Sequence, residues 1–311
     1  MLSARALPYA EHGLQSLFAH AAEALNLTLI TDEESDKQNI ERALATLDIP
    51  AKHRWSVHTQ AEADRRATIL LSNYPRLRRF RYGHPCWRKL TDPLLFSALG
   101  EEMIILDSDL YFPNLFSFEK TPDRGVLLMW QPPSCLLPDD VVRRVFAANV
   151  KLAHHVDIGV AQLRNDLDLE WFDWFVGILG GSDVPKLMHV EAIAWAAIAM
   201  RTGGGYFDAL HWYCWRYSQW KRVALKLGVP GVRLLEMQSF RSVKCFHATG
   251  VAKWWISAAC ERKIFPRPRY VSESCAPRPF EELSVREYES DQRVKRIARR
   301  LGYYDLMTPR D

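Results

Sequence analysis

Two short segments, far apart in the chain, carry residue types that could together bind a metal ion and a phosphate group. The first begins at Met103 with four apolar residues and ends in Asp107, Ser108 and Asp109. Two carboxylates placed this close together repel each other unless a cation neutralises them. Because oxygen ligands select Mg²⁺ or Mn²⁺, we expect Asp107 and Asp109 to bind a divalent metal ion.

The second segment runs from His247 to Trp255 and places an imidazole, a glycine and an ammonium in close order. His247 could complete the metal shell, and a nitrogen ligand shifts the preference towards Mn²⁺. Gly250 would let the backbone approach a phosphate closely, and Lys253 could bind that phosphate as a point charge. Taken alone, the segment is equally well read as a strand-to-helix junction with a core histidine. The acidic pair at the end of another strand favours a shared site.

The elements that must position these segments alternate between strand and helix. We expect strands at residues 27–31, 55–59, 103–106, 126–130, 156–163, 232–240 and 243–246. We expect helices at residues 15–25, 36–47, 61–71, 139–148, 171–179, 187–200, 250–260 and from 284 onward. This alternation predicts an α/β fold with a central, mostly parallel sheet flanked by helices. Such sheets bind ligands beyond the carboxyl ends of their strands, which is where Asp107 lies.

The chain divides by composition into a large part and a short C-terminal part. We expect residues 1–262 to form one ligand-binding α/β domain. Four prolines between residues 266 and 279 predict an irregular linker, and residues 263–311 would end in a helix packed on the domain. Ser284 and Glu287 form a capping-box pair that predicts where this helix begins.

Bulk properties exclude several classes of protein. A hydrophobic content of 48% is typical of a globular protein, and the net charge of +4 is modest. No apolar run is long enough to span a membrane and none resembles a signal peptide, so we expect a cytoplasmic protein. The six cysteines include no C-x-x-C pair, which predicts reduced thiols and no zinc site. Basic runs at residues 76–89 and 293–300 are nearly balanced by acidic residues elsewhere, so we expect no nucleic-acid partner. The oligomeric state stays open.

The spacing His-x-x-Gly-x-x-Lys-x-Trp, from His247 to Trp255, resembles the C-terminal signature of the glycogenin-like (family 8) glycosyltransferases. Asp107 and Asp109, with the aliphatic strand before them, resemble the Asp-x-Asp motif of that family, and residues 84–90 resemble its preceding segment. The resemblance implies a single Rossmann-like domain of the GT-A type that binds a nucleotide-sugar, usually a UDP-sugar. It also implies a Mn²⁺ (or Mg²⁺) ion and retention of the anomeric configuration, and it leaves the acceptor open.

The resemblance also assigns roles to residues. It implies metal binding by Asp107, Asp109 and His247 and diphosphate binding by Lys253. The candidate donor-binding residues are Lys253, Gly250, Arg88, Lys89 and Ser108.

Two further carboxylates are candidates for the chemistry. Asp157, near the start of a strand, and Glu191, near the start of an apolar helix, could stabilise positive charge on the sugar or orient the acceptor hydroxyl. The alternatives are a structural carboxylate bonded to backbone for Asp157 and compensation of the helix dipole for Glu191. Both alternatives stay open.

Glycosyl transfer to an unknown acceptor hydroxyl has two competitors. A nucleotidyltransferase that makes sugar nucleotides would predict a Gly-rich, basic loop near the N-terminus, and the sequence has none before its first strand. A non-catalytic protein that binds anions or sugars would use the basic run at 76–89 and the tryptophans, and would not require a metal ion. We therefore favour the metal-dependent glycosyltransferase.

Overall fold

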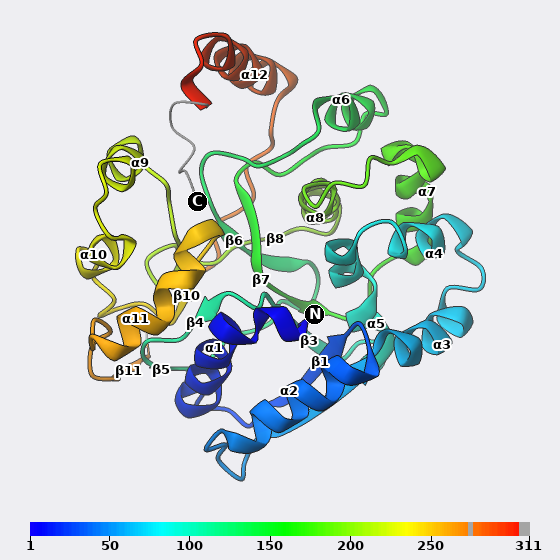
Figure 1. Ribbon diagram of the computed structural model, residues 1–311. Coiled ribbons are helices and arrows are strands. Elements are labelled where there is room, and N and C mark those ends of the chain that lie inside the picture. The colour runs from blue at the N-terminus through cyan, green and yellow to red at the C-terminus, as the bar shows by residue number, and fades with distance from the viewer. Residues whose placement is uncertain (273–275, 305–311) are drawn as a thin grey trace.

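The computed structural model describes residues 1–272 and 276–304 of the chain. Strands lie at the centre of the molecule and helices surround them (Figure 1). The strands are β1 (Asn26–Thr31), β2 (Arg54–Thr59), β3 (Glu102–Leu106), β4 (Leu110–Tyr111), β5 (Leu115–Phe116), β6 (Val126–Trp130), β7 (Val156–Arg164), β8 (Gly204–Tyr206), β9 (Trp212–Cys214), β10 (Cys245–His247) and β11 (Tyr270–Val271). The predicted α/β class is confirmed.

Helices form part of six of the ten connections between consecutive strands in the described residues. The α-helices are α1 (Leu7–His20), α2 (Glu34–Thr46), α3 (Gln60–Leu70), α4 (Pro75–Arg81), α5 (Asp92–Phe96), α6 (Asp139–Ala147), α7 (Leu169–Leu179), α8 (Val190–Thr202), α9 (Gln219–Lys226), α10 (Gly231–Glu236), α11 (Ile256–Glu261) and α12 (Val285–Arg300). The short 3₁₀ helices are η1 (Ala4–Ala6), η2 (Pro85–Leu90), η3 (Gly181–Asp183) and η4 (Gly250–Trp255).

The sheets are only partly parallel. The largest has the strand order β3-β7-β6-β8, in which β6 and β8 pair in parallel and β7 is antiparallel to both β3 and β6. A second sheet has the order β4-β10-β9, and β1 pairs with β2 in a sheet of its own. The apolar run that forms β3 suggests a central strand, yet β3 lies at one end of its sheet with β7 as its partner.

The N-terminal βαβ unit follows directly from its sequence pattern. Strands β1 and β2 pair in parallel on either side of α2 in the chain. Ile40 and Leu44 lie one helical turn apart on α2 and are both buried. Thr59 and Glu62 form a capping box that begins α3. Local pattern and capping therefore account for this part of the fold.

The core is built around β6, β7 and α8. Helix α8 is buried on all sides from Val190 to Ala199, because it packs against β7 and η2 and other segments cover it. A helix that is apolar all round is expected in such a position. Glu191 is the one charged side chain in this buried stretch, and its surroundings bear on the candidate site.

Three predicted elements differ from the observed ones. Residues 232–240, predicted as a strand, contain the short helix α10, because Val232 and Leu235 at helical spacing are buried on one face. Helix α1 begins at Leu7 and ends at His20, earlier than the predicted range at both ends. The predicted helix from residue 250 is divided into the 3₁₀ helix η4 and the α-helix α11.

The C-terminal helix begins as predicted, at the capping box of Ser284 and Glu287. Tyr288 on this helix is buried and its ring packs edge-on against Phe146. The division into residues 1–262 and 263–311 stays a prediction.

Two further expectations concern membranes and thiols. Among the helices in the described ranges, none combines the length and the apolar character that a bilayer crossing requires. The cysteines at positions 86, 135, 214, 245 and 260 are free thiols, and Cys275 lies outside the described residues.

Candidate functional site

The pairing of two short strands brings the two sequence motifs together. Strand β4 begins at Leu110, directly after Asp109, and pairs antiparallel with β10 so that His247 lies opposite Leu110. The N–H of Ala248 also donates to the backbone oxygen of Asp109 at 2.9 Å. As a result, His247 Nε2 lies 3.2 Å from Asp109 Oδ1 and 3.7 Å from Asp107 Oδ2.

These three side chains fit a divalent metal ion. Their ligand atoms all lie within 4.8 Å of one another. Bonds of about 2.1 Å at right angles place neighbouring ligand atoms about 3 Å apart, so small side-chain shifts would suffice. Two carboxylates and one imidazole suit Mn²⁺ or Mg²⁺ better than a soft metal. The donor set therefore agrees with the predicted roles of Asp107, Asp109 and His247.

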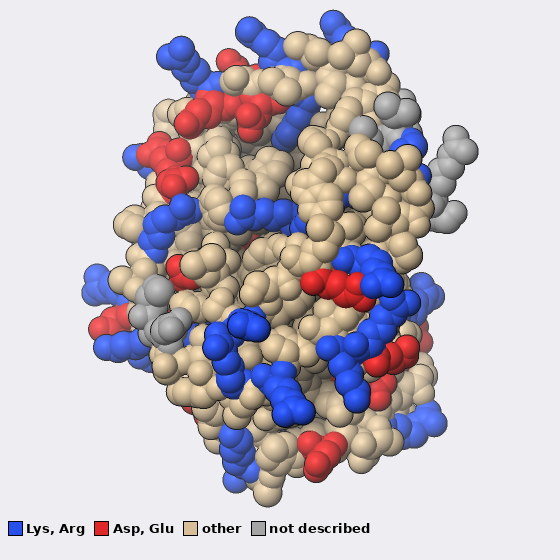
Figure 2. Space-filling view, turned by 90° about the vertical axis from the view of Figure 1, so that its left-hand side faces the viewer, with Lys and Arg blue, Asp and Glu red and all other residues tan. Residues whose placement is uncertain are grey.

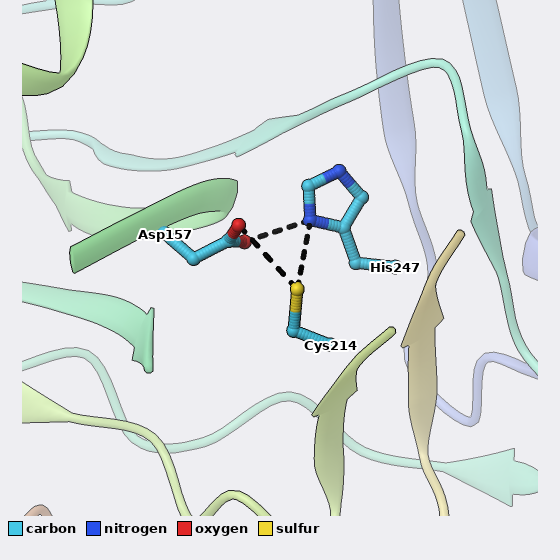
Figure 3. A group of neighbouring side chains, drawn as sticks. All are labelled: Asp157, Cys214 and His247. Atoms are coloured by element: carbon cyan, nitrogen blue, oxygen red, sulfur yellow. Dashed lines mark hydrogen bonds and ion pairs between the residues drawn. The ribbon is translucent and has the colours of Figure 1, made fainter. Parts of the chain in front are cut away.

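The other nitrogen of the imidazole is held by Asp157. Nδ1 of His247 lies 2.7 Å from Asp157 Oδ1. Because a carboxylate only accepts hydrogen bonds, Nδ1 carries the proton. Figure 3 shows that Nε2 points away from Asp157 and Cys214. A carboxylate that orients a metal-binding histidine in this way also fixes its tautomer, which leaves Nε2 available as a ligand.

Asp157 is itself fully engaged. The N–H of Gly159 donates to Asp157 Oδ1 at 3.0 Å, and the thiol of Cys214 lies 3.5 Å from Oδ2. Burial alone would raise the pKa of Asp157, but His247 and these hydrogen bonds lower it. A Cβ atom at Gly159 would lie 2.4 Å from His247 Nδ1. Glycine is thus needed here because the imidazole packs directly on the backbone of β7.

Asp157, Cys214 and His247 form a second group of possible ligands, shown in Figure 3. Burial and the neighbouring carboxylate raise the pKa of Cys214 to about 12. The thiol therefore keeps its proton near neutral pH, and the thiolate is the form that binds metals. We interpret this group as a hydrogen-bonded support for His247, with the candidate metal ligands Asp107 and Asp109 on the opposite side of the ring.

The carboxylates set the charge state of the site. Burial alone would lower the pKa of His247, but Asp157 and Asp109 raise it well above its ordinary value. Burial would likewise raise the pKa of Asp109, yet His247, Lys253 and Lys89 lower it. In the absence of a metal ion, the imidazolium thus compensates the charge of the carboxylates. Metal binding must displace its Nε2 proton.

Lys89 and Glu191 lie on the far side of Asp107. Lys89 Nζ is 2.7 Å from Asp107 Oδ1 and 3.1 Å from Glu191 Oε1. Burial alone would lower the pKa of Lys89, but the two carboxylates raise it. Burial raises the pKa of Glu191 to about 8, against the effect of Lys89. The two residues were predicted separately, for donor binding and for chemistry, and the structure places them in one buried chain of contacts with Asp107.

Arg88, Lys253 and Gly250, three other predicted donor-binding residues, have contacts outside the group of Asp107, Asp109 and His247. Arg88 Nη2 lies 2.5 Å from Asp32 Oδ1, just past the carboxyl end of β1. Lys253 Nζ lies 5.0 Å from the centroid of the Tyr9 ring, and its charge acts on Asp109 as described above. Gly250 has a φ of +61°, a conformation that favours glycine over other residues.

A cavity of about 870 Å³ adjoins the centre. It lies between β1 and β3, and residues of both strands and of α1 line it. Lys89, Asp107 and Ser108 line it as well. Its size is typical of pockets that bind small molecules.

Sequence reasoning missed Cys214 and Gly159 as parts of the site. Cys214 stands in a short aromatic strand and no local pattern distinguishes it from a core residue. Gly159 sits two positions after Asp157 inside a buried strand. An isolated glycine within a strand can indicate close approach of another group, and that signal was available.

Comparison with models of known protein families finds no match, and comparison with curated proteins finds none either. Among solved structures, the fold is similar to that of mouse xyloside xylosyltransferase 1 in its apo form. The TM-score is 0.45 and the sequences are 14% identical over 78% of this chain and 91% of the other. We therefore base the functional proposal on the geometry of the site.

Proposed function

We propose that this chain is a metal-dependent glycosyltransferase that moves a sugar from a nucleotide-sugar to an acceptor hydroxyl. The observation that carries the proposal is the meeting of Asp107, Asp109 and His247 across β4 and β10. These are the residue types that the family resemblance implies for a metal ion bound to a diphosphate. A UDP-sugar as donor and retention of the anomeric configuration belong to the proposal on the same grounds.

Each residue of the centre has a distinct task. Asp107, Asp109 and His247 would hold Mn²⁺ or Mg²⁺, which when bound neutralises charge on the departing nucleoside diphosphate. Lys253 adds a positive charge beside Asp109. Asp157 keeps a proton on Nδ1 of His247, so we assign it a positioning role.

We also assign a positioning role to Glu191. It is 1% exposed and holds Lys89 against Asp107. A side chain enclosed in this way orients a metal ligand more readily than it contacts an acceptor. The cavity between β1 and β3 provides space for the nucleoside beside Asp107 and Ser108.

Calorimetric titration of UDP tests the proposal. We expect UDP to bind the wild type in the presence of Mn²⁺ and to bind at least about tenfold more weakly in EDTA, because the diphosphate then meets carboxylates without a cation. Asp109→Asn should lose the Mn²⁺-dependent part of the affinity. Asp123→Asn is the matched control, since the side chain of Asp123 is exposed.

Release of UDP from a panel of UDP-sugars then separates transfer from simple binding. Failure of every nucleoside diphosphate to bind the wild type with Mn²⁺ would contradict the proposal. Equal binding of UDP in EDTA would favour the non-catalytic binding protein. Release of pyrophosphate from a nucleoside triphosphate and a sugar phosphate would favour the nucleotidyltransferase.

A further inference from the structure

Buried Lys and Arg side chains in the described ranges nearly all contact a carboxylate. The paired ones are Arg81, Arg88, Lys89 and Lys244. Lys221 on α9 is 5% exposed. Among the residues that the structure describes, its ammonium contacts the Trp215 ring and has no carboxylate beside it. A buried cation without a partner is unfavourable, so a stable protein rarely retains one without a function.

The surroundings of Lys221 are aromatic and basic. Its Nζ lies 3.6 Å from the centroid of the Trp215 ring. Burial and the charge of Arg216 lower the pKa of Lys221 to about 8. The Arg216 guanidinium in turn lies 4.5 Å from the centroid of the Trp130 ring, and Arg278 lies 4.7 Å from the same ring. Aromatic faces stabilise these cations only in part, because they supply no hydrogen-bond acceptor.

The segment that leads into α9 also presents unused hydrogen-bonding atoms. Arg216 Nε and Ser218 Oγ are buried and have no hydrogen-bond partner among the described residues. The guanidinium nitrogen can only donate, and the hydroxyl can donate as well. Together with Lys221, they would suit a group rich in acceptor oxygens.

This segment adjoins the metal centre. Trp215 follows Cys214, which contacts Asp157. The backbone N–H of Trp215 donates to the backbone oxygen of His247 at 2.9 Å. The hydroxyl of Thr249 donates to the backbone oxygen of Trp215 at 3.2 Å. Figure 2 shows the side of the molecule that carries α9, α10 and α11, where many Lys and Arg side chains gather.

We propose that Arg216, Ser218 and Lys221, beside the Trp215 ring, form an anion subsite that binds the phosphate or carboxylate group of a second small molecule. The diphosphate of the donor belongs with Asp109 and Lys253, so this group comes from another ligand. Naming that ligand rests on the proposed function: it is the acceptor, which is then an acidic molecule with a free hydroxyl.

Thermal unfolding in inorganic phosphate tests the subsite without metal or nucleotide. Measurements in EDTA, with chloride used to keep the ionic strength constant, should show a Tm higher by about 2 °C or more in phosphate for the wild type. Lys221→Met and Arg216→Met should lose this rise. Lys226→Met is the matched control, because Lys226 lies on the same helix and is exposed, and it should keep the rise.

The basal Tm distinguishes an anion subsite from a structural contact. Removal of an unpaired buried charge should leave the Tm of Lys221→Met unchanged or higher in chloride. A lower basal Tm together with an undiminished phosphate effect would show that Lys221 only packs on Trp215, and would overturn the proposal. Absence of any phosphate effect in the wild type would overturn it as well.

A second arm separates the two possible sources of the anion. Phosphate should still raise the Tm when Mn²⁺ and UDP are saturating, since the donor leaves the subsite free. Loss of the effect under these conditions would assign the subsite to the donor and overturn its assignment to a second ligand. The measurement in EDTA contains no metal or nucleotide. If phosphate has no effect there, the anion subsite is ruled out, and the metal-dependent binding of UDP is still tested by calorimetry.

Discussion

Two buried lysines near His247 lie in opposite electrostatic surroundings. Lys89 is held between Asp107 and Glu191 at 2.7 and 3.1 Å, which raises its pKa. Lys221 lies over Trp215 beside Arg216, without a carboxylate among the described residues, and its pKa is lowered to about 8. The first is compensated within the chain and belongs to the framework of the proposed metal centre. The second is compensated only if a ligand brings the negative charge.

Replacement of Lys89 should have the largest effect on stability. Lys89→Met leaves Asp107 and Glu191 buried near each other without a cation, so we expect the free energy of unfolding to fall by about 3–5 kcal/mol. Urea unfolding measures it. The double variant Lys89→Met/Glu191→Gln should recover part of the loss, because one buried charge is removed. A loss below about 1 kcal/mol would mean that Lys89 is not needed to compensate these carboxylates.

The two sides of the His247 ring can be compared through metal affinity. Asp157→Asn should weaken Mn²⁺ binding by about 10–100-fold, because an amide no longer fixes the proton on Nδ1. Calorimetric titration with MnCl₂ measures the change. Cys214→Ala is the matched control on the same side of the ring and should change the affinity by less than about threefold. Equal losses in both variants would place the metal ion among Asp157, Cys214 and His247 instead.

Lys221→Met should differ from Lys89→Met in the sign of its effect on the free energy of unfolding. Without phosphate, we expect the free energy of unfolding to stay the same or to rise by up to about 1 kcal/mol, because a desolvated charge is replaced by an apolar side chain of similar length. Urea unfolding of both variants in one buffer makes the comparison direct. A loss as large as that of Lys89→Met would end the distinction between the two lysines.

The last comparison concerns the dependence of stability on pH. In the unfolded chain Lys221 has its ordinary pKa of 10.5, and in the folded protein its pKa is about 8. Between these values the unfolded state binds more protons, so stability rises with pH. The stability of the wild type relative to Lys221→Met, measured in phosphate-free buffer, should therefore increase from about pH 8 to about pH 10.5. If the difference in stability between the wild type and Lys221→Met stays constant or falls over this pH range, Lys221 is not desolvated in the folded protein.

The sequence alone was sufficient to predict features that depend on residues close together in the chain. The apolar run before Asp107, the βαβ unit at the N-terminus and the capping box of Ser284 all appear where local patterns predict them. These patterns express side-chain periodicity and backbone capping, which act over a few residues. The motif at His247 could likewise be recognised from its spacing.

Only the tertiary structure decided which of these residues meet. The antiparallel pairing of β4 with β10 places His247 beside Asp109. The same long-range packing places Asp157 on the opposite side of the imidazole and leaves Lys221 without a carboxylate. Strand register and charge pairing depend on segments that are 90 or more residues apart. The energy of a charge depends on whether its partner and its water are both removed. No local pattern contains that information.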